Sequence, residues 1–210
     1  MLADASAADV GASFLDAMET DAEERLRAQA GRALAERIAT APAAGEGGAA
    51  DRLLRRCLEP GEDQLRFRAL AGLREAGLTF GQLETVLERA PATLEPEGRL
   101  WALDLAGAHA KTLGADRLLA AISGGLRDPE PKVREAALRQ LAAAGSPPAP
   151  ALGALRDPEW NVRLAAVRAL EAGPAGPEVL RALEDASRLD ANAEVRARAA
   201  AALKRQGGGR

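Results

Sequence analysis

The segment LRDPEPKVREAALRQLAAAG at 126–145 recurs as LRDPEWNVRLAAVRALEAG at 155–173, and this pair decides the fold. Both copies share the Leu-Arg-Asp-Pro-Glu opening and a Val-Arg-x-Ala-Ala interior, at one offset of 29 residues. A looser copy occupies 189–203, and degraded copies open at Glu95 and Glu59. Periods of this length are typical of helical-pair solenoids. The sequence therefore predicts five copies across 51–205.

Each copy carries the signals that begin and bury a helix. Asp128 offers a side-chain oxygen to free backbone N–H groups, and Pro129 suits the first helical position, so a helix is predicted to begin at Asp128. Val133, Ala137 and Leu141 recur every four residues and form a narrow apolar stripe. A second helix precedes each of these inner helices. The predicted inner helices are 62–76, 97–113, 129–144, 158–172 and 191–205, and the predicted outer helices are 51–58, 79–90, 115–126, 149–155 and 177–188.

The composition favours an all-α protein. Among 210 residues there are 51 alanines and 31 leucines but only seven valines, two isoleucines and 2% aromatic residues, too little β-branched and aromatic material for a sheet-built core. One histidine and one cysteine exclude a zinc finger, a disulfide framework and a His-rich metal site. The lone Cys57 lies within an apolar pattern and is interpreted as a small buried hydrophobe.

The charge pattern disfavours binding to nucleic acid or an anionic membrane. The net charge is −3, with nine acids and four arginines in residues 1–50. No long apolar run is present, and the N-terminus has acids where a signal peptide needs basic residues, so we expect a soluble, cytoplasmic protein.

The segments LRDPEPKVREAAL and LRDPEWNVRLAAV resemble the HEAT repeat, in particular the short bacterial HEAT-like form found in phycobilisome lyase subunits. The resemblance implies a right-handed α-α superhelix of about five helical pairs, with the helix after Asp-Pro on the concave face. It also implies that the aspartate and the arginine six residues later form a hydrogen-bonded ladder between repeats. The matching pairs are Asp128 with Arg134, Asp157 with Arg163 and Asp190 with Arg196. Glu59 with Arg66 is stretched by one residue, and Glu95 meets Trp101 instead of arginine.

The regular arginines could also form a phosphate-binding stripe, but an aspartate at fixed spacing from each favours the structural ladder. The copy at 95 departs most from the others: Trp101 replaces the ladder arginine, and Asp104 and His109 share its helix. Asp104 and His109 are five residues apart and do not form a ready acid–base pair. Either the three form a site, or a one-residue register slip puts Trp101 in the valine position and Leu105 in the alanine position.

The predicted concave face is the candidate partner-binding surface. Trp160 is either an exposed anchor or packs on the adjacent turn, and Leu164 and Phe67 suggest an apolar strip. Arg139 and Arg168 contact a ligand or remain solvated beside acids. The full set of candidates is Phe67, Trp101, Glu135, Arg139, Trp160, Leu164 and Arg168.

Three segments are predicted along the chain. Residues 1–50 form an acidic segment with a helix at about 21–40 and the Gly/Ala linker AAGEGGAA at 43–50. This segment either caps the solenoid or serves as a docking arm or dimerisation helix. Residues 51–206 form the repeat domain, and 207–210 form a flexible tail.

The sequence indicates no enzyme and no cofactor. It lacks a phosphate-binding loop, a nucleophile elbow and a catalytic triad, and it lacks the His-Glu pairs of HEAT-like di-iron hydroxylases. The first hypothesis is a protein-interaction scaffold that binds a helix or peptide in its concave groove. Family resemblance suggests an alternative, an accessory subunit of a chromophore lyase. A nucleic-acid-binding role like that of alkylpurine glycosylases is a third, which the acidic balance and scarce aromatics oppose.

Overall fold

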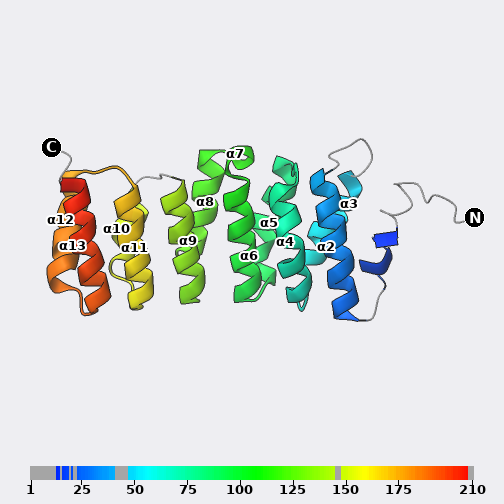
Figure 1. Ribbon diagram of the computed structural model, residues 1–210, viewed down its shortest axis with the longest axis horizontal. Coiled ribbons are helices and arrows are strands. Elements are labelled where there is room, and N and C mark those ends of the chain that lie inside the picture. The colour runs from blue at the N-terminus through cyan, green and yellow to red at the C-terminus, as the bar shows by residue number, and fades with distance from the viewer. Residues whose placement is uncertain are drawn as a thin grey trace, which may run out of the picture. The chain divides into compact units, whose positions relative to one another are not determined.

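The computed structural model describes residues 13–14, 16–18, 20, 23–40, 47–144 and 148–207. Every regular element among them is an α-helix, as the composition predicts (Figure 1). None of these helices combines the length and the apolar character that crossing a membrane requires. The chain divides into two compact units, Met1–Gly114 and Ala115–Arg210, which are described separately.

The first unit packs its helices in two rows. The inner row is α2 (Glu24–Thr40), α4 (Asp63–Glu75) and α6 (Pro96–Ala108), with α4 contacting both neighbours. Behind it lie α3 (Gly47–Cys57) and α5 (Phe80–Thr93), and the short α7 (Ala110–Leu113) follows α6. The predicted helix 97–113 is therefore two helices, since His109 interrupts it between α6 and α7.

The second unit repeats this two-row packing three times. The inner row is α9 (Pro131–Ala143), α11 (Trp160–Ala172) and α13 (Ala193–Gly207), in contact from one to the next. Each packs on the outer helix that precedes it: α8 (Ala115–Gly125), α10 (Ala149–Ala154) or α12 (Pro177–Leu189). The predicted pairs of 115–205 are thus present. Apart from 97–113, which is divided between α6 and α7, each predicted outer and inner helix keeps to within about four residues of its predicted range.

The apolar stripe of each inner helix is the core of its unit. Val133, Ala137 and Leu141 of α9 are at most 3% exposed. Full burial of a valine or leucine side chain contributes about 1.5–3 kcal/mol. The alanine between them lets adjacent helices approach closely, which explains how a core so poor in aromatic residues is filled. The stripe is equally buried in two further inner helices, at Leu65, Ala69 and Leu73 of α4 and at Val162, Ala166 and Leu170 of α11.

The inner helices of the second unit begin later than predicted. The Asp128 carboxylate accepts a hydrogen bond from the Glu130 N–H at 2.9 Å, which closes a turn ahead of the helix. Helix α9 therefore starts at Pro131, and the prediction of a start at Asp128 was wrong by three residues. Asp157 closes the same turn before α11 through the Glu159 N–H, also at 2.9 Å. The aspartate thus shapes the turn rather than capping the helix.

The N-terminal helix α2 is part of the inner row. A Cβ added at Gly72 of α4 would lie 2.4 Å from the Ala35 carbonyl carbon of α2, so the two backbones approach directly. Gly31 of α2 likewise leaves the space that Leu65 of α4 fills. The linker predicted at 43–50 is wrong from Gly47 onward, because α3 begins there and Ala49 and Ala50 are buried, while residues 43–46 lie outside the described residues. Residues 1–12 and 208–210 lie outside the described residues.

Candidate protein-interaction surface

An arginine occupies the fourth residue of every inner helix. In the first unit, the sequence repeats alone indicated only Arg66 at this position; the structure adds two more. Arg99 lies three residues after Pro96, as Arg134 lies three residues after Pro131, and this spacing was the signal in the sequence that could have revealed it. The six arginines are Arg27, Arg66, Arg99, Arg134, Arg163 and Arg196.

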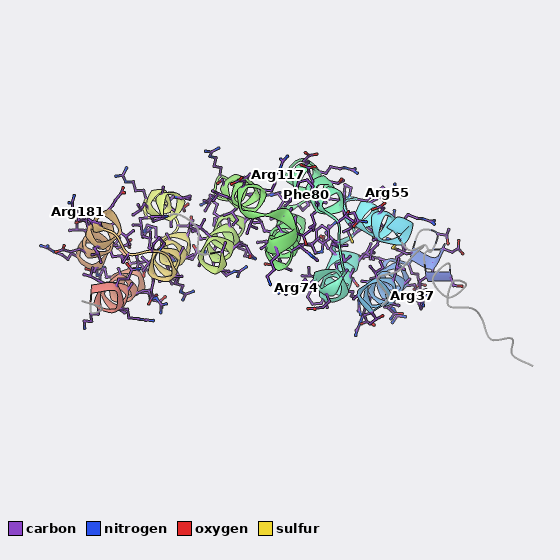
Figure 2. All side chains as sticks on the ribbon, turned by 90° about the horizontal axis from the view of Figure 1, so that it is seen from above. Arg37, Arg55, Arg74, Phe80, Arg117 and Arg181 are labelled. Carbon is purple, nitrogen blue, oxygen red and sulfur yellow. The ribbon has the colours of Figure 1, made fainter. Side chains whose placement is uncertain are left out.

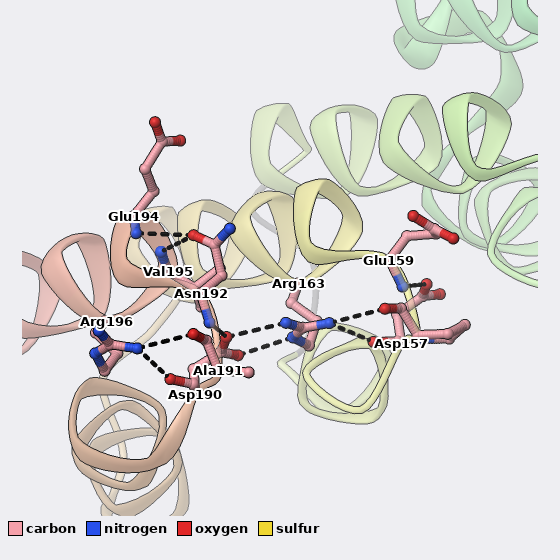
Figure 3. A network of polar contacts seen from close by, with 10 residues as sticks. Asp157, Glu159, Arg163, Asp190, Ala191, Asn192, Glu194, Val195 and Arg196 are labelled. Atoms are coloured by element: carbon pink, nitrogen blue, oxygen red, sulfur yellow. Dashed lines mark hydrogen bonds and ion pairs between the residues drawn. The ribbon is translucent and has the colours of Figure 1, made fainter.

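In the second unit these arginines join consecutive repeats. Nε and Nη2 of Arg134 donate to the two carboxylate oxygens of Asp157 at 2.7 and 2.9 Å. Arg163 binds Asp190 in the same way at 2.8 and 3.0 Å (Figure 3). The fork of a guanidinium matches both oxygens of a carboxylate, so each pair is bidentate.

The pairing differs from the expected one. Each arginine was expected to pair with the aspartate six residues earlier, but it binds the carboxylate of the following repeat. From its own repeat it takes backbone oxygens: Nη1 of Arg163 donates to the carbonyls of Asp157 and Pro158 at 2.9 and 3.1 Å. The reason is that the aspartate side chain is turned toward the N–H groups of its own turn.

Arg196 lies at the last step of the ladder. Its Nη1 donates to the carbonyls of Asp190 and Ala191 at 2.7 and 3.0 Å (Figure 3). Within the part of the chain that the structure describes, no carboxylate forms a bidentate pair with its guanidinium group. Its expected partner, Asp190, gives its carboxylate to Arg163 instead.

These contacts shift the pKa values of both partners. The hydrogen bond from Arg163 is the largest influence on Asp190 and, despite burial, holds the pKa of that carboxyl below its usual value. At Asp157, burial alone would raise the pKa, but Arg134 and the Glu159 N–H together lower it. The carboxylates raise the pKa of both guanidinium groups, chiefly through the same hydrogen bonds. The Arg134–Asp157 and Arg163–Asp190 pairs therefore stay ionised and the donors of these two arginines are occupied, which opposes a phosphate-binding role for them.

The first unit builds a related contact from different residues. Arg27 of α2 donates from Nε to the Glu62 carboxylate at 3.2 Å, and Glu62 also accepts from Arg56 at 2.8 Å. Arg66 donates to the Cys57 and Glu59 carbonyls, both at 2.9 Å. Glu59 thus offers Arg66 its backbone carbonyl and not its carboxylate.

Trp101 is buried and does not line the exposed face predicted to bind a partner. Its exposed fraction is 4%, which corrects its assignment as a partner-binding residue. The position of Arg99 aligns α6 with α9 so that Gly98, and not Trp101, matches Val133, so the one-residue slip is not the register observed. Trp101 and Leu105 are nevertheless both in the core, because α6 is buried over more than one face.

His109 is used for packing. It is 8% exposed, and its Nε2 lies 2.8 Å from the Leu73 carbonyl of α4, a contact in which the ring nitrogen donates. It therefore joins α4 to the end of α6. Among the described residues, no cluster of three or more His, Cys, Asp or Glu side chains could hold a metal ion.

The free face of the second unit's inner row carries a stripe on its middle helix. Trp160, Leu164 and Arg168 of α11 recur every four residues, and we call them the α11 stripe. Trp160 is 42% exposed, Leu164 is half-buried and Arg168 is exposed, while the outer helices pack on the opposite side.

The neighbouring helix α9 presents Glu135 and Arg139 beside the stripe. Glu135 accepts a hydrogen bond from Asn161 of α11 at 3.1 Å, and Arg139 is exposed. Phe67, the candidate in the first unit, is 82% exposed at the fifth residue of α4, the position that Leu164 occupies in α11. Each unit therefore exposes an apolar side chain on its own inner row.

Comparison with known proteins agrees with this helical architecture. Residues 115–204 match the family model for HEAT repeats. None of the curated proteins compared with the chain matches it in sequence. Solved structures with similar folds are 16–20% identical to the chain, and such likeness shows the fold alone.

Three of those structures illustrate the fold around the HEAT repeats. The crystal structure of Cex1p gives a TM-score of 0.68 at 16% identity over 96% of this chain, which spans only 43% of that protein. The crystal structure of an engineered protein gives a TM-score of 0.58 at 18% identity, and the match covers 96% of this chain and 99% of the engineered chain. A computationally designed armadillo repeat protein for modular peptide recognition gives a TM-score of 0.53 at 19% identity. That match covers 92% of this chain and 98% of the designed chain. The chain is similar to helical repeat solenoids.

Proposed function

We propose that this protein is a non-catalytic scaffold that binds a helix or peptide of another protein on the free face of its inner rows. The α11 stripe carries the proposal, because an exposed indole, a half-buried leucine and a cation lie in line on the middle helix of a rigid row. Tryptophan and arginine are the side chains that most often dominate protein interfaces.

The charges beside the stripe suggest what the partner presents. Arg139 and Arg168 are both exposed and occupy the same position in adjacent helices, 29 residues apart. An amphipathic segment with an apolar edge for Leu164 and acidic residues for the two guanidinium groups fits this face. The fold of a designed armadillo protein made for peptide recognition is a supporting analogy.

The test is affinity purification from the native cell with three baits: the wild type, Leu164→Glu and Ala120→Glu. Leu164→Glu puts a charge in the stripe, whereas Ala120 is exposed on outer helix α8. We expect one stoichiometric protein with the wild type and with Ala120→Glu, and about tenfold less with Leu164→Glu. Equal recovery by all three baits, or no stoichiometric protein at all, would contradict the proposal. The chromophore-lyase and nucleic-acid alternatives stay predictions.

A further inference from the structure

A cleft of about 570 Å³ opens between the outer helices α10 and α12, on the side of the unit away from the α11 stripe. Its apolar lining comes from Leu152 and Leu155 at the end of α10 and from Ala182, Ala186 and Leu189 of α12. Leu189 is 77% exposed, an unusual state for a leucine at the end of a packed helix.

The two helices that line the cleft differ in length. Helix α10 has 6 residues and α12 has 13, a difference of roughly 10 Å at 1.5 Å per residue. That difference is about the diameter of one helix with its side chains. Among the described residues, the outer-row helix that faces the flank of α12 from Glu178 to Leu189 is therefore only the six residues of α10.

Three charged side chains line the cleft without partners. Glu178 and Asp185 lie two turns apart on α12, and Arg156 follows α10. None of the three makes a hydrogen bond or an ion pair with any other residue that the structure describes, and all are exposed. The other two charged residues of the lining, Arg163 and Asp190, bind each other in the ladder. The unused charge of the cleft is therefore −1, with both carboxylates on the α12 side.

We propose that this cleft is a second docking site, which binds a basic amphipathic helix of a partner protein. The alanines at 182 and 186 leave no side chain beyond Cβ, so a helix backbone can approach α12 closely. The lining from Glu178 to Leu189 covers about three helical turns, roughly 16 Å. A helix of that length places apolar residues on Leu155 and Leu189 and lysine or arginine on Glu178 and Asp185.

The site is distinct from the α11 stripe, and the two proposals can fail independently. Arg156 offers a further test of the charge of the bound helix. It is the one unpaired cation of the lining, so it opposes a helix that carries only positive charges. Its removal should strengthen such a complex, whereas removal of the carboxylates should weaken it.

The test uses the full chain and a 15-residue, dye-labelled, amphipathic peptide made of leucine and lysine, with a leucine–glutamate peptide of the same pattern as control. Fluorescence anisotropy compares Glu178→Lys/Asp185→Lys with the charge-matched pair Asp116→Lys/Glu194→Lys, whose sites are exposed and outside the cleft. We expect the first pair to weaken lysine-peptide binding about tenfold and the second to change it by less than about threefold.

Arg156→Glu should tighten lysine-peptide binding about threefold, while Arg181→Glu, an exposed site on α12 outside the lining (Figure 2), should leave the affinity within about twofold of the wild type.

NMR locates the bound peptide. The amide chemical-shift changes on peptide binding should be centred on Ala182, Ala186 and Leu189, and Leu164→Glu should leave the affinity for the lysine peptide unchanged. Equal weakening by both lysine pairs, no binding of the lysine peptide, or shifts confined to α9, α11 and α13 would overturn the proposal.

Discussion

Arg134 and Arg163 each join three segments of the chain: their own helix, the turn before it and the turn that opens the next repeat. Their side chains are only 12% and 14% exposed, and the aspartates they bind are 11% and 8% exposed. Removing one partner of such a pair costs more than it does at a surface ion pair, because the other charge is left buried and unpaired.

We therefore expect Arg163→Ala to lower the free energy of unfolding by about 2 kcal/mol. Arg188→Ala is the matched control, since Arg188 pairs with Glu184 on the surface of one helix and its loss should cost less than about 0.5 kcal/mol. Urea denaturation followed by circular dichroism measures both variants. Equal losses would show that the ladder is no stronger than a surface pair.

The lowered pKa of Asp190 predicts a pH dependence of stability. Because the folded pKa lies below the ordinary value of 3.8, the unfolded chain takes up the proton first as pH falls. The contribution is complete above about pH 5 and is lost as pH falls through 3.8 toward the folded pKa. Urea midpoints at pH 6, 5, 4 and 3 should fall less steeply for Asp190→Asn than for the wild type. Parallel slopes would contradict this.

Cys57 should behave as an inert thiol in the native protein. It is fully buried, and burial raises the pKa of its thiol to about 12, so almost no thiolate is present at neutral pH. We expect no reaction with a thiol-specific chromogenic reagent at pH 8 and stoichiometric reaction once urea unfolds the chain. Reaction of the native protein at the rate of free cysteine would show that the site is open.

At the scale of elements, the approach of α2 to α4 depends on glycine. The added Cβ of Gly72→Ala would meet the Ala35–Glu36 backbone at 2.4–2.7 Å, and backbone cannot move aside cheaply. We expect a loss of about 1–3 kcal/mol in the free energy of unfolding. Gly81→Ala in α5 is the control, because nothing lies within 4 Å of its added Cβ; a gain of up to about 1 kcal/mol is expected.

At the scale of the whole molecule, the division at Gly114 predicts two separately stable parts. Helices α8 to α13 pack in three pairs, the number at which repeat arrays bury enough surface to fold alone. We expect a fragment of residues 115–210 to be helical and to unfold cooperatively by circular dichroism. A fragment that starts at 131 and lacks α8 should lose stability, because α9 then has no outer helix. A disordered 115–210 fragment would contradict the prediction.

The sequence by itself determined the class of the fold. The apolar stripes of the helices, the Asp-Pro turns and the aliphatic composition are local properties, and they recur in each repeat. It also indicated which aspartates and arginines form the ladder. Only the tertiary structure decided which repeat supplies each carboxylate to Arg163, whether Trp101 is exposed, and that α2 joins the inner row. These outcomes depend on how closely neighbouring helices approach, as at Gly72. The distance between two segments far apart in the chain cannot be predicted from the local sequence pattern of either.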